Sequence, residues 1–253
     1  MLQHTNPQPT APQATPYKTV KHKHGCYQVI TGDKFTHNNY AYSVNITDES
    51  GVRLDILTPI AAELDAMQSI YSRVLFSRFD LHLPAGTPVD IANEWMRQLF
   101  KTLRERLTSK HSRPKGVNTP INNFAYGWVR EKKEEAKQVH YHCWIALPHR
   151  QVQRLGGKTY GVASAIVDIW CKLTGGAHTL VDLAKKRVEY SDHYVIERSK
   201  PETLAGPILW VSYLAKERCK YQTGKGDRLH STSKLGSKVK VSLNPSQEAR
   251  RTL

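Results

Sequence analysis

The chain has 253 residues, 39% of them hydrophobic and 23% charged, which is the balance of an ordinary globular protein. Its 37 lysines and arginines outnumber 22 acidic residues and give a formal net charge of +15, so we expect a polyanionic partner, nucleic acid before an anionic membrane surface. No stretch of the sequence approaches the ~18 apolar residues that span a bilayer, which argues against a membrane-spanning helix.

The four cysteines are far apart in the sequence: Cys26, Cys143, Cys171 and Cys219. None of them is part of a CxxC pair, so they predict reduced thiols rather than a disulfide framework or a zinc site. Reduced thiols and the lack of a signal-peptide pattern predict a cytoplasmic protein.

The first part of the chain contains few of the apolar residues that a hydrophobic core needs. Residues 1–16 are polar and rich in proline, so we expect a disordered tail. Residues 17–72 follow as an N-terminal extension that contains one helix, at 58–72. That helix is predicted by four apolar residues at helical spacing: Ile60, Leu64, Met67 and Ile70.

The central part of the chain alternates between strand and helix patterns. Residues 73–84 alternate as a strand does, and in 87–107 an apolar residue recurs every four positions, which predicts an amphipathic helix. Residues 122–131 have strand character again, and the polar link 132–138 joins them to a third strand that begins at Val139. A short polar link between two strands predicts a hairpin.

Four further elements follow: a helix, two short strands and a last helix, at 160–174, 178–184, 193–198 and 206–220. This order predicts one α+β domain over residues 73–235, with an antiparallel-centred sheet and helices packed on one face. The remaining residues, 236–253, are expected to form a basic flexible tail.

Two histidines lie two positions apart in the third strand, within VHYHCWIALPHR at residues 139–150. Since side chains alternate along a strand, His140 and His142 share one face, with roughly 6.5 Å between their backbone positions. Imidazoles this close can chelate one cation. The alternative is a pair of half-buried strand histidines with no ligand.

A divalent cation such as Mg²⁺ or Mn²⁺ requires a carboxylate beside the imidazoles. Glu131 ends the preceding strand and reaches the histidine face if the hairpin register opposes it to His140, whereas a slip of one residue sends it to the other face. Glu134 and Glu135 near the turn, and Asp80 in an earlier strand, are alternative ligands. Two histidines and one glutamate leave positions open for phosphate oxygens, as a Lewis-acid metal in phosphoryl transfer requires.

The last predicted helix contains SYLAKE, which places Tyr213 and Lys216 one turn apart on the same face. A phenol, with a pKa of about 10, becomes an effective nucleophile only where nearby positive charge stabilises the developing anion. Lys216 can supply that charge or orient a water or phosphate oxygen, and Lys220 lies on the same, more exposed side. The alternative is an ordinary Tyr–Lys pair on a helix surface. The buried stripe is expected to comprise Leu204, Ile208, Val211 and Leu214 or Ala215.

Together these motifs resemble those of the HUH endonucleases, the rolling-circle replication initiators and relaxases. That family is named for a His–hydrophobic–His motif, here His140-Tyr141-His142, and carries its nucleophile in a YxxK-like motif, here Tyr213-Leu214-Ala215-Lys216. More narrowly, SRFDLHLP, the WVRE…HYHCWIAL hairpin and the VSYLAKE helix resemble the gene II-type initiators of filamentous phages and prophages, including the YagK/YfjJ-type proteins. The likeness covers roughly residues 70–235.

The resemblance implies an HUH nuclease domain over residues 73–235, with a Rep-like core of the ferredoxin or RRM type. It implies an enzyme that nicks one DNA strand at an origin: Tyr213 attacks the phosphodiester, a 5′-phosphotyrosine forms, and a free 3′-OH primes synthesis. A single nucleophile is expected, with Tyr221 a minor alternative. The resemblance also makes Glu131 the third metal ligand.

The SRFDLHLP strand corresponds to the first motif of that family, whose role is mainly structural and substrate-facing. Its polar residues alternate onto one face, and no chemistry is assigned to them: Arg78, Asp80 and His82.

The segment after the last helix is basic and suited to phosphate contacts, which position DNA without reading its sequence. The residues expected to make these contacts are Lys220, Arg228, His230 and Lys234. The implied partners are single-stranded or origin DNA of a phage, prophage or plasmid, with host helicase and polymerase, in the cytoplasm of a bacterial host.

Two other functions fit parts of the pattern. A non-catalytic DNA-binding or regulatory protein uses the same basic surface with structural histidines, and a metal-dependent hydrolase activates water and leaves Tyr213 incidental. Replacement of Tyr213 by Phe separates the three functions, because it abolishes covalent capture of DNA only in a tyrosine nickase.

Overall fold

The structure is a computed structural model that describes residues 19–21, 27–47, 50–132, 139–185, 192–218, 220 and 228–236. The tail expected at residues 1–16 lies outside these ranges, as do residues 237–253 of the expected C-terminal tail. Among the helices within the described ranges, none combines the length and the apolar character that crossing a bilayer requires.

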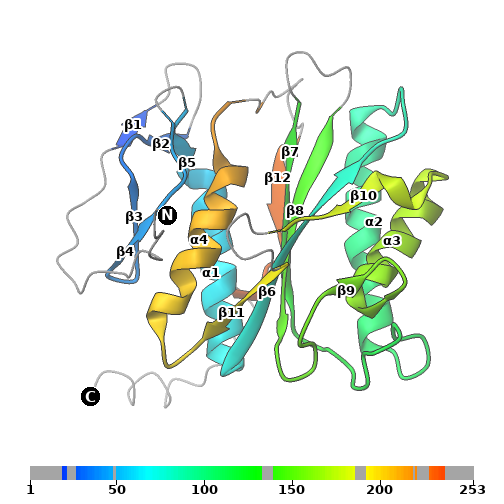
Figure 1. Cartoon of the computed structure of the whole chain (residues 1–253). Helices are drawn as coiled ribbons and strands as arrows, with labels where there is room; N and C mark the ends of the chain where they lie inside the picture. The colour runs from blue at the N-terminus through cyan, green and yellow to red at the C-terminus, as the bar shows by residue number, and fades with distance from the viewer. Residues whose placement is uncertain are drawn as a thin grey trace, which may run out of the picture.

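A six-stranded antiparallel sheet forms the centre of the molecule (Figure 1). Its strands are β6 (Arg73–His82), β7 (Ala125–Glu131), β8 (His140–Pro148), β10 (Val181–Leu183), β11 (His193–Glu197) and β12 (His230–Thr232). The strand order is β10-β6-β8-β7-β12, and β11 pairs with β6 on the edge that β10 also uses. The predicted hairpin is confirmed as β7 and β8.

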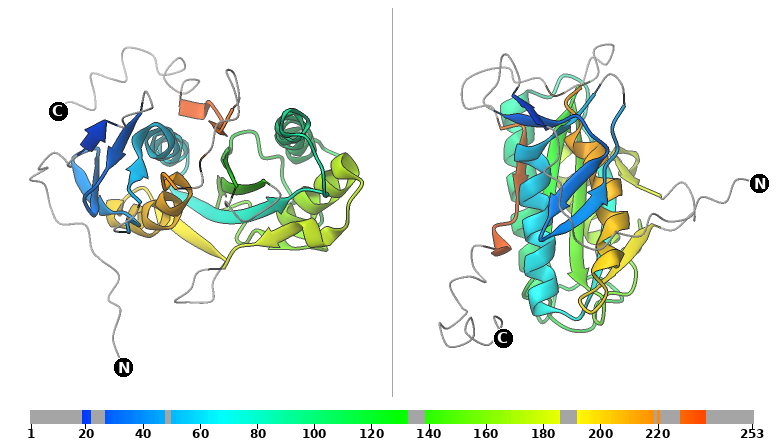
Figure 2. Two further views of the ribbon diagram at one scale, coloured as in Figure 1. Left: turned by 90° about the horizontal axis from the view of Figure 1, so that it is seen from above. Right: turned by 90° about the vertical axis from the view of Figure 1, so that its left-hand side faces the viewer.

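Helices cover both faces of this sheet. They are α1 (Leu54–Ile70), α2 (Val89–Thr108), α3 (Gly161–Thr174) and α4 (Ala205–Ser212). Seen from above, α1 and α4 lie on one side of the sheet and α2 and α3 on the other (Figure 2).

The residues of β6 explain this two-sided packing. Val74 and Phe76 belong to the core beneath α1 and α4, whereas Leu75, Phe79 and Leu81 belong to the core beneath α2 and α3. A strand that is buried on both faces has a nearly continuous apolar sequence rather than a clean alternation. The α+β class with an antiparallel sheet is confirmed, but the expectation of helices on one face is wrong, because the sheet presents apolar side chains on both.

The N-terminal part adds small sheets and contributes a core helix. A three-stranded sheet contains β1 (Thr19–Lys21), β2 (Gln28–Ile30) and β5 (Val52–Arg53), and a hairpin contains β3 (Lys34–His37) and β4 (Tyr40–Ser43). The remaining short elements are β9 (Gly156–Gly157), η1 (His178–Leu180), η2 (Pro201–Leu204) and η3 (Tyr213–Ala215). Helix α1 starts at Leu54, four residues before the predicted start, and packs on the sheet although the sequence places it in the N-terminal extension.

The last described segment is held by a buried carboxylate of α1. Glu63 accepts a hydrogen bond from the Ser233 hydroxyl and from the backbone N–H groups of Leu235 and Gly236, the latter two at 3.0 Å each. Ser233 Oγ in turn accepts the Tyr126 N–H at 3.0 Å, next to β12. The carboxylate therefore joins α1, the start of β7 and the end of β12.

We expect Glu63→Gln to lower the free energy of unfolding by about 2–3 kcal/mol, since the amide turns a donor toward N–H groups that now bind a carboxylate oxygen. Urea denaturation followed by circular dichroism measures this change. Glu105→Gln on the exposed side of α2 is the matched control and should stay within about 0.5 kcal/mol of the wild type. Equal effects of the two substitutions would contradict the anchoring role of Glu63.

Candidate metal centre and adjacent tyrosine

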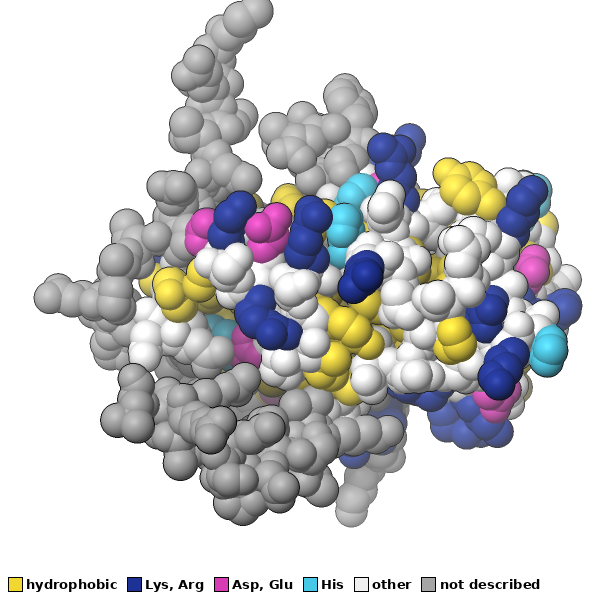
Figure 3. All heavy atoms as spheres, turned by 90° about the horizontal axis from the view of Figure 1, so that it is seen from below, with side chains coloured by type: hydrophobic (Ala, Val, Ile, Leu, Met, Phe, Trp, Pro, Cys, Tyr) yellow, Lys and Arg dark blue, Asp and Glu magenta, His cyan; other side chains and the backbone are white. Residues whose placement is uncertain are grey.

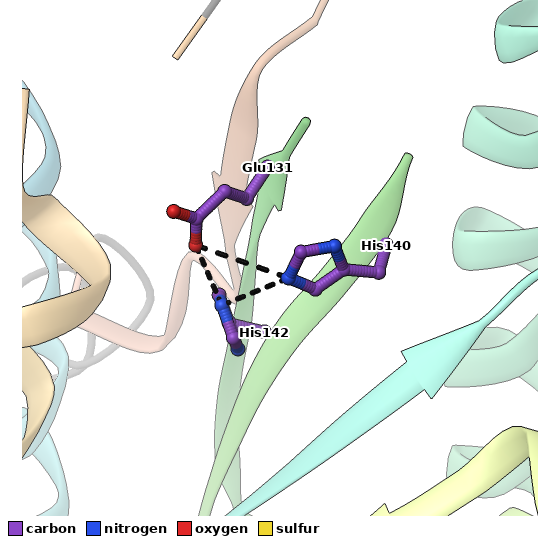
Figure 4. Close-up of side chains that lie close together, drawn as sticks. All are labelled: Glu131, His140 and His142. Atoms are coloured by element: carbon purple, nitrogen blue, oxygen red, sulfur yellow. Dashed lines mark hydrogen bonds and ion pairs between the residues drawn. The ribbon is translucent and has the colours of Figure 1, made fainter. Parts of the chain in front are cut away.

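Three potential metal ligands converge at one end of the β7–β8 hairpin. The register pairs Glu131 with His140 and Val129 with His142, which puts the carboxylate on the histidine face of the sheet. Glu131 Oε2 lies 2.6 Å from His142 Nε2 and 3.9 Å from His140 Nε2, and the two Nε2 atoms are 3.2 Å apart. Figure 4 shows the three side chains pointing toward one another from the two strands.

This triad, Glu131, His140 and His142, can hold one divalent cation. Its ligand atoms all lie within 4.8 Å of one another, and Glu131 and His142 are buried while His140 is half-buried. One carboxylate oxygen and two imidazole nitrogens suit a cation that accepts both oxygen and nitrogen ligands. The alternative ligands Glu134 and Glu135 lie outside the described residues.

Asp80 contacts one of the histidines of the triad. The β6–β8 register pairs Asp80 with His142, and its Oδ1 lies 2.7 Å from His142 Nδ1, the ring nitrogen that faces away from Glu131. A carboxylate on the second nitrogen fixes the ring and its tautomer, and makes the first nitrogen a better ligand. From the sequence, Asp80 was an alternative metal ligand, and no chemistry was assigned to the polar residues of its strand. Its contact with His142 Nδ1 instead suits it to orient the ring.

The electrostatics of Glu131 and His140 favour the forms that bind a metal, whereas those of His142 favour its protonated form. Burial raises the pKa of Glu131, but its hydrogen bond to His142 and the charge of Lys220 outweigh this and lower the pKa to about 2. Burial and the neighbouring His142 lower the pKa of His140 to about 4. For His142, burial lowers the pKa, but hydrogen bonds to Asp80 and Glu131 raise it overall. At neutral pH Glu131 is therefore ionised and His140 is neutral, with a lone pair available.

We expect Asp80→Asn to weaken Mn²⁺ binding roughly 10- to 100-fold, because an amide holds the His142 ring less firmly than a carboxylate. Isothermal titration calorimetry with the full chain measures the affinity. Asp182→Asn is a close control: Asp182 opposes Asp80 on β10 and contacts His82 at 3.1 Å, outside the triad. If neither substitution changed the Mn²⁺ affinity, an orienting role of Asp80 would be ruled out.

Tyr213 lies beside the triad. It is the first residue of η3, directly after α4, and its half-buried ring packs edge-on against His142 with 5.9 Å between ring centroids. Helix α4 rests on the sheet through the predicted stripe, in which Leu204, Ile208, Val211, Leu214 and Ala215 are all buried. The packing of the stripe thus turns Tyr213 toward the paired histidines.

The chain leaves the helix before Lys216, so the predicted helix over 206–220 is wrong beyond Ala215. Lys216 is extended, with φ −55° and ψ 138°, and bridges to Val52, while the Glu217 N–H donates to the Gly51 carbonyl at 3.0 Å. Pairing with this edge replaces the last helical turn. Lys216 Nζ nevertheless lies 5.3 Å from the centre of the Tyr213 ring.

Lys220 belongs to the triad's surroundings rather than to the surface. The sequence grouped it with the DNA contacts, but its side chain is buried and its Nζ lies 3.7 Å from Glu131 Oε2. Burial disfavours a charged group and a nearby opposite charge offsets this cost, which Glu131 can do for Lys220. The helical spacing of Tyr213 and Lys220 did not indicate it, because the chain leaves the helix after Ala215.

The other predicted DNA contacts lie in β12 or beside it. Arg228 and Lys234 are exposed, and His230 is half-buried, 3.6 Å from Asp55 and opposite Val129 in the register. They therefore lie along the strand next to β7, which ends in Glu131. The second candidate nucleophile, Tyr221, lies outside the described residues.

The family model of the YagK/YfjJ C-terminal domain matches residues 35–229 of the chain. No curated protein and no solved structure matches the chain. The matched span begins in β3, includes α1 and contains the whole triad together with Tyr213 and Lys220. Since the match covers well over half of its length, the chain belongs to the YagK/YfjJ C-terminal domain family.

Proposed function

We propose that the protein is a metal-dependent, site-specific endonuclease that nicks one strand of DNA through a covalent 5′-phosphotyrosine, as HUH endonucleases and gene II-type phage initiators do. The observation that carries this proposal is the contact between Tyr213 and the Glu131–His140–His142 triad, with 5.9 Å between the rings of Tyr213 and His142. A structural histidine pair gives no reason for a half-buried tyrosine at this point.

The chain's own residues account for most of the reaction. The Tyr213 oxygen attacks phosphorus, the bond from phosphorus to the 3′-oxygen breaks, and the 5′-phosphate stays on the tyrosine. The phenol loses a proton and the departing 3′-oxygen gains one, so a 3′-OH is released. Lys216 is buried beside the Tyr213 ring rather than on the more exposed side, and in this proposal its ammonium stabilises the charge of the phosphate. Mg²⁺ or Mn²⁺ held by the triad would supply Lewis-acid polarisation of the phosphate oxygens.

The charge of the chain supports DNA as the substrate. Its net charge of +15 predicts affinity for phosphates that falls steeply with salt. Lysine and arginine side chains also lie across the end of the molecule away from the triad, with acidic side chains among them (Figure 3). Because these basic side chains do not form one patch, they do not indicate where DNA is cleaved. We therefore assign the cleavage site to the triad and Tyr213. A released 3′-OH would prime a host polymerase in rolling-circle replication, with a host helicase unwinding the duplex.

The experiment is incubation of the full chain with Mn²⁺ and labelled single-stranded DNA of mixed sequence, followed by denaturing electrophoresis. We expect a protein band shifted by covalently attached DNA, and no such band with EDTA. Cleavage without an adduct would instead indicate a hydrolase that uses water. Salt-sensitive binding with neither cleavage nor adduct would indicate a non-catalytic DNA-binding protein.

A further inference from the structure

Arg78 is a buried cation at the site to which the reaction proposed above gives no role. It lies on β6, two residues before Asp80, and only 6% of its surface is exposed. Its Nη1 donates to the Trp210 carbonyl at 2.9 Å, and its guanidinium carbon lies 5.2 Å from the centre of the Trp210 ring and 5.7 Å from that of Tyr213. Arg78 Nε has no hydrogen-bond partner among the described residues.

Burying the Arg78 guanidinium in this way costs folding free energy. A buried guanidinium normally has a carboxylate partner, and within the described part of the chain Arg78 makes no ion pair, although the charges of Asp80 and Glu131 act on it at longer range. A buried N–H without a partner costs a further ~1–3 kcal/mol. Stability alone favours an apolar side chain at this point, so the position of Arg78 calls for another explanation.

The geometry gives one. The Trp210 carbonyl belongs to the last turn of α4, three residues before Tyr213, so the hydrogen bond from Arg78 holds the end of that helix against the sheet. The same strand presents Asp80 to His142. One rigid strand therefore contacts both the metal-binding histidine and the segment that carries the tyrosine.

We propose that Arg78 is a positioning residue that holds Tyr213 against His142. This inference rests on the proposed nicking function and adds a residue to the same site. Arg78 belongs to the strand that corresponds to the family's first motif. That strand would then have more than a structural role, because Arg78 acts through Tyr213.

The first test does not depend on cleavage. 3-Fluorotyrosine is introduced at position 213 of the full chain, and its ¹⁹F resonance is recorded with and without stoichiometric Mn²⁺, whose unpaired electrons broaden nearby signals. We expect strong broadening in the wild type, at least twofold less in Arg78→Met, and an intermediate value in Arg78→Lys. The Mn²⁺ affinity, measured by calorimetry, should be unchanged in both variants.

Arg104→Met is the matched control. Arg104 also donates to a backbone carbonyl, that of Asn122, and packs over an aromatic ring, that of Phe124, but it lies on α2 on the other face of the sheet. It should leave the ¹⁹F broadening as in the wild type. Equal broadening in the wild type and both Arg78 variants overturns the inference. A wild-type resonance that bound Mn²⁺ leaves sharp overturns the metal–tyrosine site itself, and the inference with it.

The second test uses the rate of adduct formation in a single turnover. We expect Arg78→Met to slow it at least tenfold with DNA affinity unchanged, and Arg78→Ala to recover part of its rate when methylguanidinium is added. A residue that only supports the fold would not show such rescue. An undiminished rate in Arg78→Met overturns the positioning role, and Arg78→Lys serves as the test variant if Arg78→Met folds poorly.

Discussion

Replacement of Tyr213 by phenylalanine is expected to abolish the covalent protein–DNA adduct while leaving the affinities for Mn²⁺ and DNA unchanged. Phenylalanine keeps the ring that packs against His142, Lys216 and Arg78, and removes only the oxygen that would attack phosphorus. The loss should be on the order of 10³-fold or more, the scale on which removal of a catalytic nucleophile acts. Denaturing electrophoresis of labelled DNA after incubation with Mn²⁺ measures it.

Tyr160→Phe is the control for this substitution, because Tyr160 is exposed and precedes α3 on the other face of the sheet. It should form the adduct at the wild-type rate. Adduct formation by Tyr213→Phe would move the nucleophile elsewhere, first to Tyr221, which Tyr221→Phe would then test. Cleavage without an adduct in both the wild type and Tyr213→Phe would identify water as the nucleophile.

His142→Ala is expected to have the second large effect, a loss of Mn²⁺ affinity of about 100-fold or more together with loss of nicking. The substitution removes a ligand and also leaves Glu131 and Asp80, the two carboxylates that contact its ring, without the imidazole between them. The proposed DNA binding should remain and keep its dependence on salt, because we attribute it to lysine and arginine side chains outside the triad. Calorimetry with Mn²⁺ and filter binding over a range of salt concentrations measure the two affinities separately.

His82→Ala provides the comparison. His82 lies on the same face of the sheet and stacks on His140 with 5.9 Å between ring centroids, but it does not belong to the triad. Its Mn²⁺ affinity should stay close to that of the wild type. If His142→Ala binds Mn²⁺ as the wild type does, the triad is not the metal site, and nicking that continues in EDTA would show that the reaction needs no metal.

Local spacing was enough to predict several parts of the site. Alternation along a strand places His140 and His142 on one face whatever lies around them, and the structure has them there with 3.2 Å between their Nε2 atoms. The apolar stripe of the last helix likewise follows from its period, and its members are buried. The α+β class followed from the order of strand and helix patterns in the same way.

Contacts between strands distant in the sequence needed the tertiary structure. The hairpin register that brings Glu131 to the histidine face was one of two that its sequence allowed, and a slip of one residue exchanges the faces. The places of Asp80 at His142 Nδ1 and of Arg78 under Trp210 depend on the β6–β8 register and on the packing of α4, which no local pattern of β6 contains.

The sequence by itself therefore determined the chemistry that is available: two imidazoles on one strand face, a nearby carboxylate, a tyrosine beside lysines, and a strongly basic composition. Only the tertiary structure decided which of these groups meet. It covered both faces of the sheet, ended the last helix before Lys216 through the bridge to Val52, and buried Lys220 against Glu131. The physical reason is that side-chain period is a property of a short segment, whereas register, helix ends and the burial of a charge are set by partners far away in the chain.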